Sequence, residues 1–426
     1  MTTEVGGHCF APALSRAAWG ATQSPRMPST SPLRDRWELD PELDFLNHGA
    51  FGACPRAVLA AQAEVRRELE RQPVAFMVRK LPPLLDAARE RLARFVGADP
   101  EGMVPVPNAT TGVNTVLRAV APALARGDEL LVTDHAYNAC RNALDFVADG
   151  TGARVVVARV PFPCGSPEEA REAVLAGAGP RTRLALVDHV TSQTGLVLPI
   201  AEIVCDLATR GIDTLVDGAH APGMVPLEVE RLGAAWYTGN CHKWLCAPKG
   251  AGFLWIRADR REAVRPLVVS HGFNTRRQGR SRLHDEFDWT GTGDPTAFLA
   301  VPAALDALAG MVPGGWPEVM RRNRDLALAG RAVLCAALLV ASPAPESMLG
   351  SLASLPLPPS DAAEGARSPG LEDPLHEELL DRFAVEVPVF PWPAPPRRLL
   401  RISAQLYNDL AQYERLAAVL AELLPP

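Results

Sequence analysis

Lys243 is notable for the residues around it. It lies in the stretch 235–252, AWYTGNCHKWLCAPKGAG, directly after His242 and before Trp244. Lysine is rarely buried without a task. Removal from water lowers the pKa of a lysine, and its free amine can then form a Schiff base with a carbonyl compound. The alternative is a lysine whose stem follows an apolar loop while its ammonium reaches solvent, and one such motif does not decide between the two.

A carboxylate occurs 26 residues before this lysine. Residues 214–223 read TLVDGAHAPG, and their apolar run ends at Asp217. This pattern predicts a buried strand with a carboxylate at its C-terminal end, where open α/β sheets bind ligands. A buried carboxylate needs a cationic partner. The protonated ring nitrogen of pyridoxal phosphate (PLP) is such a partner, and Lys243 would hold the aldehyde of the same cofactor. Asp217 and Lys243 are therefore the predicted catalytic residues.

Further motifs occur in the order seen in a known family. Between about Leu46 and Tyr407 they are FLNHGAFGACP, KLPPLLDAARERLARFVGADP, NATTGVN, DHVTSQTG, DGAHAPG, CHKWLCAPKGAGFL and RISAQLYN. Through them the chain resembles the class V aminotransferase family of fold-type I PLP-dependent enzymes, and in particular its isopenicillin N epimerase-like members. The resemblance implies an α/β fold, in which a large domain with a mainly parallel seven-stranded sheet is followed by a small α+β C-terminal domain.

The resemblance also implies a phosphate site. Residues 104–116, VPVPNATTGVNTV, predict a strand, a loop of small residues and the start of a helix. The N–H groups at a helix N-terminus suit a phosphate dianion. By the family pattern, Ala109 and Thr110 contact the cofactor phosphate and Thr111 lies beside them. A simple helix cap is the alternative.

Several side chains are expected around the cofactor ring. In residues 129–142, ELLVTDHAYNACRN, the resemblance implies that either His135 or Tyr137 stacks on the ring, and we favour Tyr137 slightly. In residues 183–199, RLALVDHVTSQTGLVLP, either Ser192 or Gln193 would lie near the ring hydroxyl, whereas His189 has a structural role. The other residues that we expect to bind the cofactor lie next to the catalytic pair: His220, Asn240 and His242.

Three residues are predicted to bind the substrate. Arg401 lies in the alternating apolar stretch LLRISAQLY, and a buried arginine needs an anion, for which its planar fork suits a carboxylate. The resemblance implies that this anion is the α-carboxylate of an amino acid; an internal salt bridge is the alternative. It also places Asn47 and His48, in the Gly-rich stretch 44–55, on the substrate side of the site, with a plain turn as the alternative.

A loop at residues 287–294, FDWTGTGD, resembles the segment that reaches a neighbouring subunit in this family. Thr292 of one chain would then contact the cofactor phosphate held by the other. The resemblance therefore implies a homodimer with shared active sites.

The fate of the substrate after loss of its α-proton decides the reaction. Return of the proton to the other face gives an epimerase or racemase, which we favour; loss of a β-substituent gives a C–S lyase, and proton return elsewhere gives an aminotransferase. A cysteine desulfurase would need a nucleophilic cysteine in the C-terminal half. Because the only cysteine after Cys246 is Cys335, in the apolar stretch CAALLVA, desulfurase activity is disfavoured. A non-enzymatic scaffold is disfavoured because the lysine, aspartate, phosphate loop and arginine are all present.

The helices and strands that must position these residues can also be predicted from the sequence. Residues 56–94 predict two helices, the second opened by Pro82 and Pro83. Further expected elements are a strand at 250–257, a helix at 297–309, a strand or two around an irregular loop at 343–374, and strands at 385–396 and 399–407.

Length and composition limit the possible number of domains, the binding partners and the cellular location. The 426 residues suffice for two domains, which we expect at 37–305 and 306–426, with the first part of the large domain a candidate to pack on the small one. Residues 1–36 are expected to be a disordered tail, with a misplaced start or a targeting peptide as alternatives. The net charge of −6 argues against nucleic acid, and no apolar run is long enough for a membrane span. Eight scattered cysteines predict reduced thiols in a cytoplasmic protein without a metal site.

Overall fold

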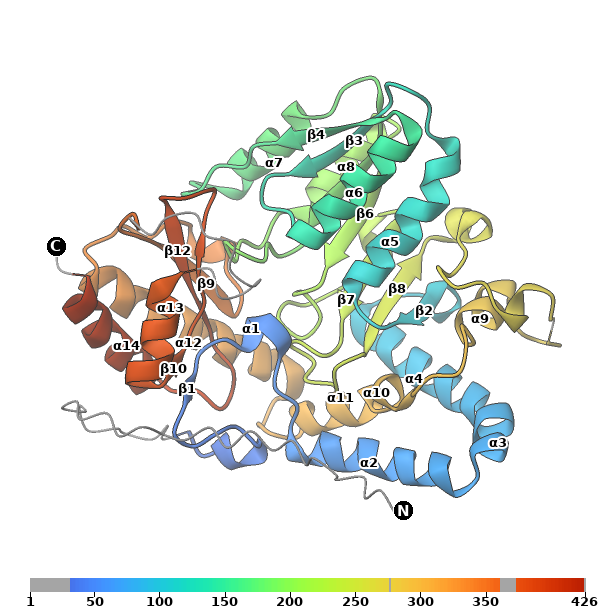
Figure 1. Cartoon of the computed structure of the whole chain (residues 1–426), viewed down its shortest axis with the longest axis horizontal. Coiled ribbons are helices and arrows are strands. Elements are labelled where there is room, and N and C mark those ends of the chain that lie inside the picture. The colour runs from blue at the N-terminus through green and yellow to red at the C-terminus, as the bar shows by residue number, and fades with distance from the viewer. Residues whose placement is uncertain (1–30, 276, 361–372, 425–426) are drawn as a thin grey trace, which may run out of the picture.

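The computed structural model describes residues 31–275, 277–360 and 373–424. A large α/β part is built around a seven-stranded sheet, and a smaller part is built around β9 and β12 (Figure 1). The two parts lie side by side, with the helix α12 (Gly315–Ala337) in the smaller one.

The large sheet is mainly parallel, as predicted. Its strands lie in the order β2-β8-β7-β6-β5-β3-β4, and only β8 runs antiparallel to its neighbours. Because the parallel strands point the same way, their C-terminal ends meet at one edge of the sheet, where such sheets bind ligands. The strands are β2 (Met103–Val106), β3 (Glu129–Thr133), β4 (Arg154–Ala158), β5 (Thr182–Asp188), β6 (Asp213–Gly218), β7 (Trp236–Asn240) and β8 (Gly252–Ile256).

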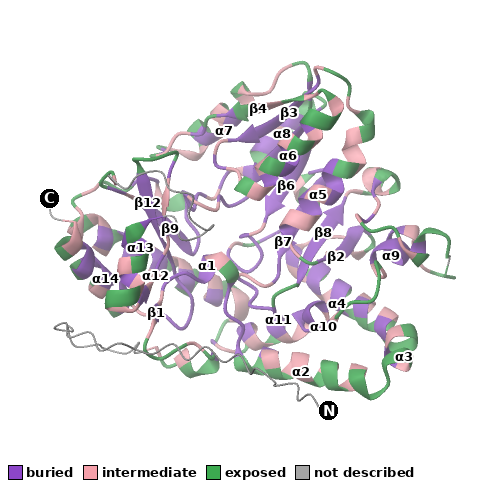
Figure 2. Ribbon diagram, in the orientation of Figure 1, coloured by how far each residue is buried: buried purple, intermediate pink, exposed green. Residues whose placement is uncertain are grey.

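Helices cover both faces of this sheet, so its strands are continuous apolar runs rather than alternating ones. In β5, for example, Leu184 and Leu186 belong to one hydrophobic cluster, whereas Ala185 and Val187 belong to another. The first cluster includes residues of α5 (Ala109–Val120), α6 (Asn138–Thr151) and α9 (Arg282–Phe287). The second includes residues of α4 (Leu81–Val96), α7 (Pro167–Ala176), α8 (Ile200–Thr209), α10 (Thr296–Leu299) and α11 (Val301–Ala309). Figure 2 shows the resulting buried sheet between more exposed helices.

The smaller part combines an antiparallel sheet with three helices. Its strand order is β11-β12-β9, with β11 (Val389–Pro391), β12 (Arg398–Ser403) and β9 (Leu352–Leu357), and its other helices are α13 (Pro374–Phe383) and α14 (Leu410–Leu423). The helix α14 begins with a capping box between Asp409 and Gln412. The short strand β1 (Asp44–Phe45) pairs with β10 (Val385–Glu386). The segment that holds β1 therefore packs on the small domain. The sequence had made the first part of the large domain a candidate for this position.

The segment before the large sheet is more helical than predicted. Only β1 is extended in the stretch 44–55, because the chain turns into the short helix α1 (His48–Phe51). The two expected helices are α2 (Arg56–Arg71) and α4, the latter with proline in its first turn, and they are joined by α3 (Pro73–Ala75) and a π-helical turn at Phe76–Lys80.

Three other sequence expectations need correction. The part of the tail that the structure describes is ordered, because the Ser31 hydroxyl donates to the carbonyl of Leu406 at 2.6 Å and Arg34 donates to the carbonyl of Asp40; residues 1–30 lie outside the described residues. The expected domain boundary at 305 falls inside α11. The strand expected at 385–396 is divided into β10 and β11, since its prolines interrupt the ladder, and the one at 399–407 ends at Ser403.

The region 343–374 holds one strand, β9, among its described residues, and 361–372 lie outside them. Within the described parts of the chain, no helix is long and apolar enough to cross a membrane. The same residues contain no group of three or more histidine, cysteine or acidic side chains placed to hold a metal ion.

Two glycines allow the chain to approach the backbone around Lys243. Gly52 has a φ of +70°, and a Cβ there would lie 2.0 Å from the carbonyl oxygen of His242. Gly223 has a φ of +86°, and its Cβ would lie 2.7 Å from the carbonyl oxygen of Trp244. Any larger residue would displace this loop, because both neighbours are main-chain atoms that cannot rotate away.

We predict that Gly52→Ala lowers the stability of the protein more than Gly233→Ala does. Gly233 has a similar φ of +74° but open space around it, so its alanine variant bears only the strain of a left-handed residue, about 1–2 kcal/mol. Gly52→Ala adds a clash with the loop and should cost roughly 2 kcal/mol more. Thermal unfolding of both variants measures the difference, and equal losses would contradict the assigned role of Gly52.

Candidate active site

The predicted cofactor residues gather at the C-terminal edge of the large sheet. Asp217 lies near the end of β6 and Asn240 ends β7. Asp188, which was not among the predicted residues, ends β5 at the same edge. The first turn of α5 follows β2 at the same edge, and the small domain adds β12, which carries Arg401. Residues that are far apart in the sequence are thus brought to one place by the direction of the strands.

Lys243 follows β7, and its Nζ lies 3.0 Å from Nε2 of His220. The indole N–H of Trp244 donates to Nδ1 of the same histidine at 3.3 Å. An indole nitrogen is only a donor, so Nδ1 accepts and a neutral His220 carries its proton on Nε2. That proton points to Lys243, whose amine must then accept it with a lone pair. The geometry therefore describes Lys243 as a free amine.

The electrostatic surroundings agree with an uncharged amine. Burial lowers the pKa of Lys243 to about 7, and the positive charge of Arg401 contributes to the shift. Burial also lowers the pKa of His220 well below its usual value, with Lys243 as a further cause. Such an amine is a nucleophile and a base near neutral pH, whereas an ordinary lysine is almost fully protonated.

Asp217 is buried, and both of its oxygens accept hydrogen bonds. The N–H of Ala219 donates to Oδ1 at 2.9 Å, and the thiol of Cys140 donates to Oδ2 at 3.2 Å. Burial raises the pKa of Asp217. Sequence reasoning did not single out Cys140; its position at the start of the helix after β3 was the available signal, since that helix begins at the same edge as Asp217.

The first turn of α5 is partly occupied by the protein itself. The N–H of Ala109 donates to Oδ1 of Asn240 at 2.9 Å, so this predicted phosphate donor already has a partner. The N–H and hydroxyl of Thr111 both contact Oδ1 of Asn108. Among the described residues, the N–H and hydroxyl of Thr110 have no such partner, which makes Thr110 the best placed of the three predicted phosphate contacts.

The two candidates for ring stacking differ in exposure. His135 is fully buried, its Nε2 donates to the carbonyl of Val160 at 2.9 Å, and its Nδ1 accepts from the Thr194 hydroxyl at 2.7 Å. Tyr137 is 47% exposed, and it lies close enough to Arg401 to affect the pKa of Arg401. The exposure favours Tyr137, whose ring is accessible to a ligand, whereas the ring of His135 is enclosed by other protein groups.

Arg401 is a buried cation without a carboxylate partner among the described residues. Its Nη1 donates to the carbonyl of Ser192 at 2.6 Å, and its Nη2 donates to Oδ1 of Asn47 at 3.3 Å. Its Nε has no acceptor in that part of the chain, and the residue is 5% exposed. Arg398, on the same strand, instead forms an ion pair with Asp373 at 2.8 Å. The salt-bridge alternative therefore fits Arg398 and does not fit Arg401.

The position of His48 does not support the predicted contact with substrate. The side chain is fully buried, and burial lowers its pKa to about 3. Its Nε2 donates to the carbonyl of Lys243 at 3.1 Å, and its Nδ1 accepts from the hydroxyl of Tyr407 at 2.8 Å. His48 thus holds the main chain of the lysine, whereas Asn47 contacts Arg401 beside it.

The remaining predicted residues divide between the site and its surroundings. Ser192 contacts Arg401 through its carbonyl, and the carbonyl of Gln193 accepts from Ser354 at 2.6 Å. Nδ1 of His242 donates to the carbonyl of Ala251 at 3.1 Å. The structural role given to His189 agrees with its contact to the Tyr237 hydroxyl at 3.0 Å. Thr292 lies in an exposed loop between α9 and α10, and within the described chain it forms no hydrogen bond with these residues.

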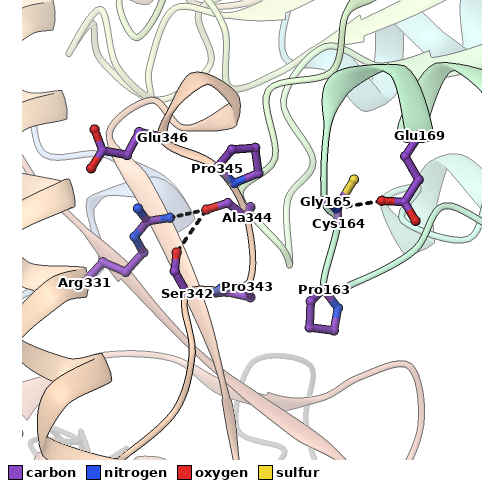
Figure 3. Close-up of a pocket in the computed structure, with 10 residues that line it drawn as sticks. All are labelled: Pro163, Cys164, Gly165, Glu169, Arg331, Ser342, Pro343, Ala344, Pro345 and Glu346. Atoms are coloured by element: carbon purple, nitrogen blue, oxygen red, sulfur yellow. Dashed lines mark hydrogen bonds between the residues drawn. The ribbon is translucent and has the colours of Figure 1, made fainter.

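A cavity of about 710 Å³ lies elsewhere, between the loop before α7 and the small domain (Figure 3). On one side of the cavity Arg331 and Ser342 both donate to the carbonyl of Ala344, and on the other side the N–H of Gly165 donates to Glu169. None of the predicted cofactor or substrate residues lines it. The cavity belongs to the junction between the domains and not to the candidate active site.

Comparison with known proteins decides the family. The model of the aminotransferase class-V family matches residues 53–327. The chain is 39% identical to isopenicillin N epimerase of Amycolatopsis lactamdurans over 92% of this chain and 97% of that protein. The chain belongs to the class-V aminotransferase family. A putative L-cysteine desulfhydrase of Oryza sativa subsp. japonica is 33% identical, over 89% of this chain and 84% of that protein.

A solved structure supports the same fold. The C-DES protein with glycine covalently linked to its PLP cofactor superposes with a TM-score of 0.73 and 23% identity, over 89% of this chain and 96% of that one. The α/β fold and the class-V enzyme predicted from the sequence are thereby confirmed, and PLP is the cofactor.

The charges of this class-V site fit that cofactor. Lys243 offers a free amine, Asp217 offers a buried anion, and Thr110 offers two donors at a helix N-terminus. Arg401 adds a buried cation whose Nε has no acceptor among the described residues. A ligand with an aldehyde, a cationic ring nitrogen and a phosphate complements the first three groups, and a substrate carboxylate complements the fourth.

We predict that Arg401→Lys raises KM for the substrate by about 10–100-fold and changes kcat much less. Lysine keeps a positive charge but cannot bind a carboxylate with two parallel hydrogen bonds, and a charged hydrogen bond contributes roughly 1.5–3 kcal/mol. Steady-state kinetics measures the effect once the substrate is known. Arg398→Lys, which alters the internal ion pair with Asp373, is the matched control. An equal KM increase in both variants would contradict a specific role for Arg401.

Proposed function

We propose that the protein is an epimerase or racemase acting at the α-carbon of an amino acid or a compound that contains one. The carrying observation is the free amine of Lys243, held by His220 within one site that also contains buried Arg401, whose Nε has no acceptor among the described residues. The amine can remove a proton, and the arginine can bind the carboxylate next to the carbon that loses it. The choice of epimerisation over other reactions is supported by 39% identity to an isopenicillin N epimerase.

Each residue has a separate task in this proposal. Arg401 binds the substrate carboxylate, and Asn47 fixes the guanidinium because its own amide donates to Glu386 at 2.8 Å. Lys243 accepts the α-proton at Nζ. Asp217 keeps a negative charge at the end of β6. When bound, PLP supplies the electron-withdrawing ring that stabilises negative charge on the substrate α-carbon.

A C–S lyase is the second candidate. Here the same proton removal by Lys243 is followed by departure of a β-thiolate with its electron pair, so no oxidant is needed. The observation in its favour is the 33% identity to a putative L-cysteine desulfhydrase. Transamination would use the same residues but has no comparable support from these relatives.

Cysteine desulfurase activity stays disfavoured. Cys335 lies inside α12, packs against the hydrophobic core of the small domain, and has its pKa raised by burial. A thiol in that position is a poor nucleophile, because the thiolate is the reactive form.

We predict that the enzyme incorporates deuterium at Cα when amino acids, including β-lactam precursors with an amino-acid side chain, are incubated in D2O. Exchange accompanied by inversion of configuration is the expected result, and release of sulfide or another β-substituent without inversion would show the lyase instead. Mass spectrometry and chiral chromatography measure the outcomes. Lys243→Ala should abolish exchange, whereas the control Lys80→Ala, which removes an exposed lysine paired with Glu68, should retain it. Exchange that persists in Lys243→Ala would contradict the mechanism.

We also infer that the protein works as a homodimer with shared sites. Thr292 is exposed and outside the cluster around Lys243. The region from α1 to the π-helical turn exposes large apolar side chains: Phe51 at 74%, Val74 at 78% and Val78 at 67%. Exposed apolar groups of this size are typical of surfaces that a partner covers, and Figure 2 shows α2 and α3 on the outside of the chain.

We predict that inactive Lys243→Ala and inactive Thr292→Arg chains restore activity when mixed. In a shared arrangement, a mixed dimer places both lesions in one site and leaves the other site intact. Up to about a quarter of wild-type activity should return for random mixing, because half of the dimers are mixed and each has one working site. Subunit exchange is verified with differently tagged chains. Exchange without recovery would contradict the shared site.

A further inference from the structure

A second acid stands beside Asp217 and is not used in the reaction described above. Asp188 and Asp217 end neighbouring parallel strands and are paired in register. Register-paired residues point to the same face of a sheet and lie about 5 Å apart. Each of the two side chains belongs to a residue that is only 3% exposed. Two negative charges this close together and out of water repel each other strongly, so both cannot be ionised at low cost.

The groups that face the two acids do not balance two negative charges. From α6 comes the thiol of Cys140, which donates to Asp217. On β7, Thr238 is paired in register with Asp217 and so lies on the same face, and its hydroxyl donates to the carbonyl of Phe253 at 2.9 Å. Tyr237 is paired with Val216 and points to the other face of the sheet. From the loop after β7 comes Lys243, the free amine described above.

The two histidines next to the acids on β5 and β6 are also neutral. Burial lowers the pKa of His189 to about 4 and that of His220 well below its usual value. Among the described residues, no permanent cation therefore faces the pair directly, and Arg401 contributes only through its effect on Lys243.

The hydrogen bonds distinguish the two acids. Both oxygens of Asp217 accept from protein donors, which suits an ionised carboxylate. The carboxyl group of Asp188 interacts with the backbone N–H groups of Asp188 and Tyr137, but its Oδ2 is buried and has no donor among the described residues. A carboxylate oxygen can only accept, whereas a protonated one can donate. A buried carboxyl group with an oxygen that lacks a donor is less costly when it is protonated and neutral than when it carries a second negative charge.

We propose that Asp188 carries the proton of a buried carboxyl pair, so that Asp217 alone holds the negative charge at this edge of the sheet. Burial and the charge of Asp217 both raise the pKa of Asp188 well above its usual value, which agrees with this arrangement. Asp188 then acts as a positioning residue for Asp217: it is a neutral neighbour that does not compete for the cationic ring nitrogen. This last step rests on the proposed function, whereas the location of the proton does not.

The proton can be observed directly by infrared spectroscopy of the PLP-loaded enzyme at neutral pH. The wild-type spectrum minus that of Asp188→Asn should contain the carbonyl band of a protonated carboxylic acid, shifted in D2O. The control is Asp206→Asn, which removes a surface carboxylate paired with Arg171 and should leave that band in place. A wild-type difference spectrum that shows only the bands of an ionised carboxylate would overturn the proposal. If Asp188→Asn fails to fold, the spectrum of Asp188→Ser is subtracted from that of the wild type instead.

Cofactor affinity gives a second, independent readout. Asparagine is neutral like the protonated acid and can also donate, so PLP should bind Asp188→Asn with a dissociation constant within about threefold of wild type. A loss of more than about tenfold, in a variant with a normal circular dichroism spectrum, would mean that a charge at position 188 is required and would refute the assignment. Neither measurement uses a substrate. Failure of the epimerase proposal therefore leaves both results interpretable.

Discussion

The active site depends on keeping the amine of Lys243 uncharged near neutral pH. Burial supplies most of the effect, Arg401 adds to it, and His220 presents a proton to the lone pair. The tautomer of His220 is set in turn by the indole of Trp244. The lysine loop must therefore be held rigidly, and Gly52 and His48 do this through contacts with its main chain. The contacts of Gly52 and His48 with this loop thus help to fix the position of the Lys243 Nζ atom.

Two buried charges that no described residue neutralises indicate the charges that the ligands must carry. An anion at Asp217 and a cation at Arg401 are both buried, and each lacks an oppositely charged partner among the described residues. Buried charges of this kind are costly in an empty site. They become favourable when a cofactor and a substrate of complementary charge are bound. Because Arg401 belongs to the small domain and Asp217 to the large one, the substrate site requires both domains to be in contact.

The sequence was most informative where chemistry requires a particular residue type. Lys243, Asp217 and Arg401 were identified from their apolar surroundings and from the order of the family motifs, and the structure brings them to one edge of the sheet. The sequence was less informative about neighbours. Cys140 and Asp188 were not selected from it, it placed His48 with the substrate, and it assigned Ala109 to the phosphate although the N–H of Ala109 donates to Asn240. These differences concern hydrogen-bond partners that are far apart in the chain.

By itself, the sequence determined the fold class and the cofactor through the order of its family motifs. It determined the central lysine and aspartate through their apolar surroundings, which can be read along the chain. Tertiary structure alone decided which charges remain without partners. Arg398 and Arg401 look alike in sequence, but only Arg398 meets a carboxylate, Asp373. The physical reason is that the energy of a buried charge depends on what surrounds it in space, and strand order, register and domain contact set those surroundings.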